Sequence, residues 1–145
     1  YHSNRNILFF GFYFSYFDNY TYNGINFAVL LNRINKRIEH LIGRDHTIGH
    51  SYFMSVNSYN DLKEAFQNKI IPLLQEYFFG DYGKIGLVLG KDFFEPIDDT
   101  KNENLFSDFY DYDGDEFAQR TIYVLKNVTL FTNDEIKTAV TNLLK

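Results

Sequence analysis

The sequence predicts a mainly α-helical protein with a minor β component, an α+β fold. Two long segments, residues 26–42 and 58–80, repeat apolar side chains at steps of three and four, the spacing of one helix face. Residues 134–144 show the same spacing over a shorter length, whereas residues 121–125 combine β-branched and aromatic side chains as strands do. We therefore expect a helical domain followed by a small strand-and-helix tail.

Composition narrows the classes of function. The chain of 145 residues is long enough for one hydrophobic core, and 16 phenylalanines and 12 tyrosines predict that aromatic packing dominates it. The absence of cysteine excludes disulfides, thiolate zinc sites and cysteine nucleophiles, and fits a reducing compartment. A net charge of −5 argues against direct DNA binding, which draws its affinity from basic side chains on phosphates.

The first 25 residues form an aromatic lead-in. The chain begins at Tyr1 without a methionine, which is typical of a piece excised from a longer protein. Residues 7–14 have a strand-like composition but are too short and too aromatic for a transmembrane helix, and no signal-peptide cleavage site follows them. We expect a cytoplasmic protein with no membrane contact.

The first predicted helix leads into a polar loop. Asn26 is a suitable N-cap, the apolar spacing continues to Ile42, and Gly43 is expected to end the helix as a left-handed residue. The polar residues 44–47 then lie between two apolar segments, which is where a functional site is expected.

The second predicted helix begins after Ser58 and ends at Gly80. Pro72 lies inside it and predicts a kink or break between Ile71 and Leu73, because proline removes a backbone donor and clashes with the preceding turn.

The rest of the chain is less regular. Residues 84–89 fit either a short strand or a third short helix. Residues 95–116 carry nine acidic side chains against one lysine, a balance typical of a solvated loop. A turn-containing connection over 127–133 then precedes a final helix capped by Asn133 or Asp134.

Two histidines four residues apart, His46 and His50, suggest a zinc protease at first sight. The glutamate of that motif is replaced by Thr47, and Gly49 disfavours the helix it requires. We therefore expect no metal site. The simpler interpretation, favoured over metal binding, is that His50 is hydrogen-bonded within the loop.

Two other motifs fail on spacing. Aligning the acidic stretch with a calcium loop through Gly114 places Phe109 and Arg120 where oxygen ligands are required. The glycines between residues 80 and 90 lack the G-x-x-x-x-G-K-[ST] pattern that cradles phosphates, so the chain alone is not expected to hydrolyse GTP or ATP.

Two stretches, INKRIEHLIGRDHTIGHSYFM and LKEAFQNKIIPLLQEYFFGDYGKIGLVLG, resemble the C-terminal helical lid of McrB-type GTPases. These are AAA+ motor subunits of 5-methylcytosine-specific restriction systems. The resemblance covers about residues 30–90, and its most specific pieces are RDHTIGHSYFM and IIPLLQEYFFGD. In the family an arginine-rich stretch precedes the lid, whereas the corresponding part of this chain has only Arg5.

The resemblance implies a division into a lead-in (1–25), an AAA+ lid-like helical subdomain (26–90), and an acidic loop with a strand and C-terminal helix (91–145). It implies a parent protein that hydrolyses GTP with Mg²⁺, assembles with its own subunits in a ring, and activates an McrC-type endonuclease for DNA restriction. DNA would be contacted through other parts of that parent. For this chain alone we expect no cofactor and no activity.

The resemblance also indicates a site. The turn between the first helices of an AAA+ lid approaches the nucleotide, which makes His50 and Ser51 the nucleotide-facing candidates, with Asp45, His46 and Gly49 shaping the loop.

A basic side of the first helix allows two interpretations. It is either a solvated face or a contact with a neighbouring subunit, and it consists of Arg33, Lys36, Arg37 and Arg44.

A rival hypothesis is a stand-alone, non-catalytic protein-interaction module, a degenerate remnant of such a motor. A lid cut from a motor should expose an apolar face and self-associate, whereas a free-standing module should cover that face with residues 7–17.

Overall fold

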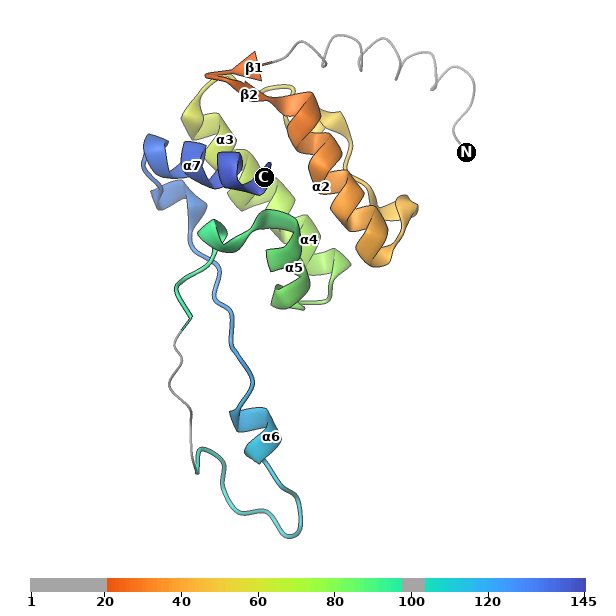
Figure 1. Cartoon of the computed structure of the whole chain (residues 1–145), viewed down its shortest axis with the longest axis vertical. Coiled ribbons are helices and arrows are strands. Elements are labelled where there is room, and N and C mark those ends of the chain that lie inside the picture. The colour runs from red at the N-terminus through yellow and green to blue at the C-terminus, as the bar shows by residue number, and fades with distance from the viewer. Residues whose placement is uncertain (1–20, 98–103) are drawn as a thin grey trace.

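The computed structural model describes residues 21–97 and 104–145, so the strand-like segment expected over residues 7–14 lies outside the described part. The described residues are mainly helical with one two-stranded sheet, which confirms the predicted fold class (Figure 1). The helices form a compact body, from which a long arm carrying α6 (Asp115–Ala118) extends.

A small hairpin opens the described chain. Strands β1 (Thr21–Tyr22) and β2 (Ile25–Asn26) pair antiparallel around Asn23 and Gly24, whose φ angles of 48° and 84° are both positive. Two consecutive positive φ angles define the tight turn that matches the twist of antiparallel strands. The hairpin delivers Asn26 to the start of the first described helix.

Helix α2 (Phe27–Ile42) begins as predicted, because the Asn26 side chain accepts a hydrogen bond of 3.1 Å from the Val29 N–H. The helix also ends at Gly43, but the expected left-handed conformation is wrong. Gly43 has φ 118° and ψ 167°, an extended backbone region open essentially to glycine alone. Helix α2 therefore ends at Gly43, and the first turn of the loop begins at the next residue.

The second predicted helix is one irregular rod made of α3 (Tyr59–Ala65), a π-helical turn (Phe66–Ile70) and α4 (Ile71–Tyr77). Its N-cap is Ser58, as predicted, with the hydroxyl accepting from the Asp61 N–H.

The break expected between Ile71 and Leu73 is wrong in position, because α4 runs through Pro72 and the irregular turn precedes it. The proline ring crowds the carbonyl four residues earlier, within the π-helical turn, so the backbone widens there. In the widened turn the Ile71 N–H donates to the Phe66 carbonyl, five residues back.

Residues 84–89 belong to a helix, not a strand. Helix α5 (Tyr82–Leu89) is capped by Asp81, whose carboxylate accepts from the Lys84 N–H at 3.3 Å.

The C-terminal helix α7 (Asn133–Leu143) is present, but its cap is Thr132 instead of Asn133 or Asp134. Thr132 occupies the N-cap position because it forms a capping box. Its hydroxyl accepts from the Glu135 N–H, and the Glu135 carboxylate accepts from the Thr132 N–H.

The strand predicted over residues 121–125 is reduced to a single bridge between Leu125 and Phe94. The Glu95 N–H donates to the Val124 carbonyl, and the Lys126 N–H donates to the Phe93 carbonyl. The segment that contains Phe94 follows directly after a 3₁₀ turn (Lys91–Phe93). The two segments therefore pair at one position only.

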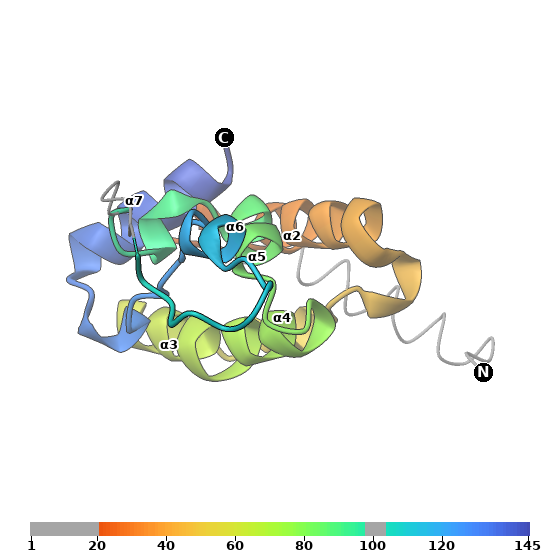
Figure 2. The same ribbon diagram turned by 90° about the horizontal axis from the view of Figure 1, so that it is seen from below.

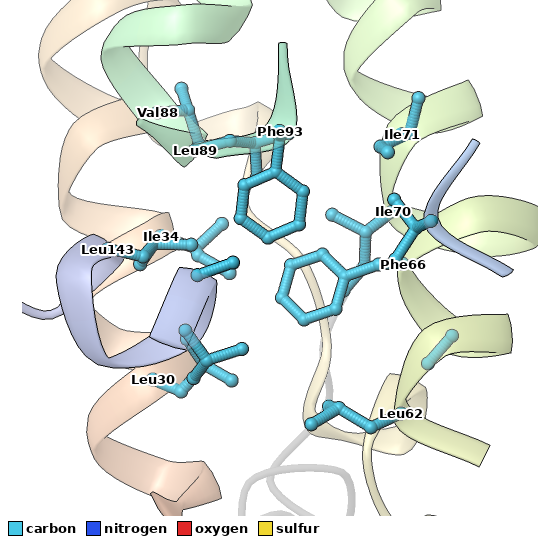
Figure 3. Close-up of a cluster of buried hydrophobic side chains, with 14 of the residues drawn as sticks. Leu30, Ile34, Leu62, Phe66, Ile70, Ile71, Val88, Leu89, Phe93 and Leu143 are labelled. Atoms are coloured by element: carbon cyan, nitrogen blue, oxygen red, sulfur yellow. The ribbon is translucent and has the colours of Figure 1, made fainter. Parts of the chain in front are cut away.

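The core lies between two layers, with the α3–α4 rod on one side and α2, α5 and α7 on the other (Figure 2). Phe66 of the rod and Phe93 meet at its centre with ring centroids 5.1 Å apart (Figure 3). All 27 buried residues of this core come from the helical body, defined as residues 21–94 and 125–145. The described residues of the arm, defined as residues 95–124, contribute none of them.

Candidate functional site

The loop between α2 and α3, residues 43–58, contains every predicted site residue. It folds as two short 3₁₀ turns, Arg44–His46 and His50–Tyr52. Between the turns Ile48 is buried, with only 4% of its surface exposed. The loop is thus attached to the core at its middle while its polar residues face outward.

Asn35 of α2 fixes this attachment. Its amide nitrogen donates to the Ile48 carbonyl at 2.8 Å, and its amide oxygen accepts from the Ile48 N–H at 2.5 Å. One side chain therefore satisfies both backbone groups of Ile48, as a neighbouring β-strand would. No sequence pattern pointed to Asn35, because the two residues meet only through the tertiary fold.

The structure places the predicted residues on both sides of this attachment. His46 packs edge-on against Tyr77 at the end of α4, with ring centroids 5.2 Å apart. His50 is half-buried, and the remaining predicted residues are exposed, namely Asp45, Gly49 and Ser51. All five lie in this one loop, and their role toward a nucleotide stays a prediction.

Burial lowers the pKa of His50 below its usual value of 6.5. At neutral pH its imidazole is therefore mostly uncharged, with one nitrogen that donates and one that accepts. In this state His50 can hydrogen-bond a polar ligand, but it does not supply a positive charge.

The basic side of α2 is partly used inside the molecule. The Arg33 guanidinium donates to the Leu144 carbonyl at 2.5 Å, and the Arg37 guanidinium donates to the Val88 carbonyl at 2.7 Å. These two arginines thereby hold the C-terminal ends of α7 and α5, where carbonyl groups lack helical partners.

The other two basic residues face outward. Lys36 is exposed, and Arg44 forms a 3.6 Å ion pair with Glu39. Only these two remain candidates for contact with another molecule.

In the described ranges, 21–97 and 104–145, no three His, Asp or Glu side chains are grouped as metal ligands would be. No helix in the same ranges has the length and apolar character needed to cross a bilayer.

A family model described as "McrB, alpha-helical lid domain" matches residues 26–86. The match begins at the N-cap of α2 and ends inside α5, so it contains the Asn35–Ile48 attachment and the whole loop. No curated protein matches the chain. Residues 26–86 therefore match the α-helical lid of McrB, and through them the chain resembles a component of McrB-like restriction systems.

Proposed function

We propose that this chain is the lid of an McrB-like restriction GTPase, which closes over the nucleotide and contacts the neighbouring subunit of a ring. The observation that carries the proposal is the Asn35–Ile48 attachment within the matched lid segment. It holds a polar, solvent-facing loop in one conformation, as a nucleotide-sensing group requires.

A sensing group gains most when it is positioned before the ligand arrives, because binding then costs little ordering entropy. The buried Ile48 supplies that order, while the neutral imidazole of His50 and the hydroxyl of Ser51 offer hydrogen bonds to a nucleotide. Asp45, His46 and Gly49 determine the path of the loop around them.

The chemistry of GTP hydrolysis belongs to other parts of the parent protein. This chain lacks a phosphate-cradling glycine loop, and its described carboxylates do not gather as Mg²⁺ ligands. GTP with Mg²⁺ would bind to the motor core, and the lid would report its state to the neighbouring subunit and, through the ring, to an McrC-type endonuclease. Contact with DNA is assigned to other parts as well.

The exposed side of α2 offers a place for the subunit contact. Lys36 and Arg44 face solvent there, whereas Arg33 and Arg37 are engaged inside the molecule. An acidic surface on the neighbouring subunit would complement the two exposed cations.

The test is GTP turnover by the full-length protein that contains this lid. His50→Ala should lower turnover while the thermal unfolding midpoint stays near the wild-type value. His40→Ala, which changes an exposed histidine on α2, is the matched control and should leave turnover unchanged. Wild-type turnover in His50→Ala would remove the sensor role.

A second candidate function, a non-catalytic interaction module, is favoured by the apolar side chains that the arm exposes. Ten of the fourteen large apolar side chains exposed in the described residues lie on the arm. If the full-length protein is folded but neither binds nor hydrolyses GTP, this module describes it better than the lid of a motor.

A further inference from the structure

The end of the arm carries a cleft, called the aromatic cleft below, that is lined mainly by aromatic rings. Its volume is about 560 Å³, and its lining residues are Phe106, Ser107, Phe109, Tyr112, Gly114 and Phe117. The four rings are between 41% and 70% exposed, so none of them is buried in a core. In Figure 1, α6 and the loop before it lie at the end of the arm farthest from the helical body, where the rings are open to another molecule.

Local contacts within the arm form the aromatic cleft. The Tyr112 N–H donates to the Phe109 carbonyl at 3.0 Å, which closes a tight turn with one of these rings at each end. The Phe117 N–H donates to the Gly114 carbonyl at 3.0 Å, at the start of α6. A Cβ atom at Gly114 would lie 2.8 Å from the Phe106 ring, so this ring packs directly on the backbone there. The cleft therefore needs no support from the core.

The residues between and beside these rings are acidic. Five carboxylates lie within residues 106–117, and all are exposed, namely Asp108, Asp111, Asp113, Asp115 and Glu116. The same range has no lysine or arginine, and none of the five carboxylates forms an ion pair with any residue of 21–97 or 104–145. Negative charge that has no cationic partner in the described chain favours a cationic ligand from outside.

Arg120 shows how a cation is held in this part of the arm. The central carbon of its guanidinium lies 4.7 Å from the centre of the Phe117 ring, within the range of attraction between a cation and an aromatic face. Arg120 does not line the aromatic cleft, so the other rings keep their surface open. A guanidinium also donates paired hydrogen bonds to carboxylates, so it matches both kinds of side chain that the cleft presents.

Charge and ring chemistry together select the partner. Nucleic acid does not fit, because its phosphates would be repelled by the carboxylates. A purely apolar segment does not fit either, because it would remove the neighbouring carboxylates from water without pairing them. Arginine side chains on a protein segment contact the rings and pair with the carboxylates at the same time.

We infer that the aromatic cleft binds an arginine-bearing segment of another protein, with guanidinium groups on the rings and the neighbouring carboxylates as their hydrogen-bond acceptors. The inference concerns the arm alone and does not require the nucleotide role proposed for the loop.

Fluorescence anisotropy with the whole chain and no nucleotide tests the inference. The probe is a labelled synthetic peptide of alternating arginine and glycine, and the same peptide with lysine in place of arginine is the matched control. Both peptides carry the same charge, so attraction to the acidic arm alone would bind them equally. The arginine peptide should bind about fivefold more tightly or better, because a guanidinium stacks on rings and pairs with carboxylates more effectively than an ammonium does.

Ring variants locate the binding. Replacing both rings of the turn, by Phe109→Ala with Tyr112→Ala, should weaken binding of the arginine peptide about tenfold or more. Ile122→Ala is the control, because Ile122 is 79% exposed on the same arm and does not line the cleft. The unfolding midpoint should stay constant in both variants, since none of these residues belongs to the core.

Charge variants test the acidic part of the site. Asp111→Asn should weaken binding of the arginine peptide and reduce its dependence on salt, because one screened attraction is lost. Glu64→Gln, which changes an exposed acid on α3, should do neither.

Three results would overturn the inference: no binding of the arginine peptide, equal affinity for the lysine peptide, or an equal loss in Ile122→Ala. Sedimentation velocity without peptide tests the other occupant, a second copy of the chain. The wild-type chain and the double ring variant should sediment alike at every concentration. Dimers that form in the wild-type chain and disappear in the ring variant would assign the cleft to a second copy and overturn the inference as well.

Discussion

The helical body and the arm both contain many apolar and aromatic residues, but only the body buries them in a core. The body holds all 27 residues of the buried core, whereas Ala118 is the one buried residue among the described residues of the arm. The arm sequence has nine acidic and two basic side chains, while the body sequence has nine acidic and eleven basic ones. The net negative charge of the chain is therefore a property of the arm.

This difference shows that aromatic content alone does not produce a core. In the body, apolar residues recur at helical spacing, so each helix has one continuous face that packs on its neighbours. In the arm, aromatic residues alternate with carboxylates, and any face that buried the rings would bury charges as well. The rings of the arm stay exposed and available to other molecules.

Substitution of one phenylalanine in each region tests the comparison most strongly. Phe66→Ala should lower the free energy of unfolding by about 3–5 kcal/mol, because the ring is fully buried against Phe53 and Phe93. Phe109→Ala in the arm, where the ring is 65% exposed, should change it by less than about 0.5 kcal/mol. Urea denaturation measures both, and equal losses would mean that the arm shares the core.

Removing the hydrogen bonds that attach the loop to α2 should have the next largest effect on the free energy of unfolding. Asn35→Ala leaves both backbone groups of the buried Ile48 without their partner, which should cost about 1–3 kcal/mol. Asn32→Ala changes an exposed asparagine on the same helix and serves as the control. Amide exchange at Ile48 should accelerate in the first variant only, and unchanged exchange there would show that the loop is held by other contacts.

Removing the N-cap of α7 should have a smaller effect on the free energy of unfolding, and this effect should depend on pH. Thr132→Ala should lower the free energy of unfolding by about 1 kcal/mol at neutral pH, and Thr138→Ala, an exposed position within the helix, should not.

The backbone and side-chain hydrogen bonds of Thr132 lower the pKa of Glu135 below 4.5 in the folded state. The unfolded chain therefore binds this proton more readily. The stabilisation is present above pH 4.5 and is lost as the pH falls through the folded pKa. Thermal unfolding between pH 6 and pH 3 should show a flatter pH dependence in Thr132→Ala, and an unchanged slope would exclude the capping box as its source.

The smallest effect on global stability is expected at the end of the arm. A Cβ atom at Gly114 would lie 2.8 Å from the Phe106 ring, so Gly114→Ala should displace that ring. Aromatic NMR shifts of Phe106 and its neighbours should move, while the unfolding midpoint of the body stays constant. A shift of that midpoint by several degrees would contradict the separation of arm and body.

Local signals in the sequence predicted most of the helical body. The apolar spacing located α2, the α3–α4 rod and α7, and the caps Asn26 and Ser58 were predicted because capping depends on neighbouring residues. The effect of Pro72 was placed one turn too late, since the proline distorts the turn before it.

Contacts between distant residues escaped prediction. The attachment of Ile48 to Asn35 and the hydrogen bonds of Arg33 and Arg37 to distant helix ends depend on how the helices pack. The strand expected at 121–125 has the right composition but only one paired position, because a strand needs a partner of matching length. The nucleotide-facing role of His50 and Ser51 came from family resemblance and stays a prediction.

The most direct measurement is hydrogen exchange of the full-length protein with and without a non-hydrolysable GTP analogue. If the lid closes over the nucleotide, amides of residues 44–52 should exchange more slowly with the analogue bound, while those of residues 104–117 in the arm keep their rates. Unchanged exchange over residues 44–52 with the analogue bound would contradict the proposed role of the loop.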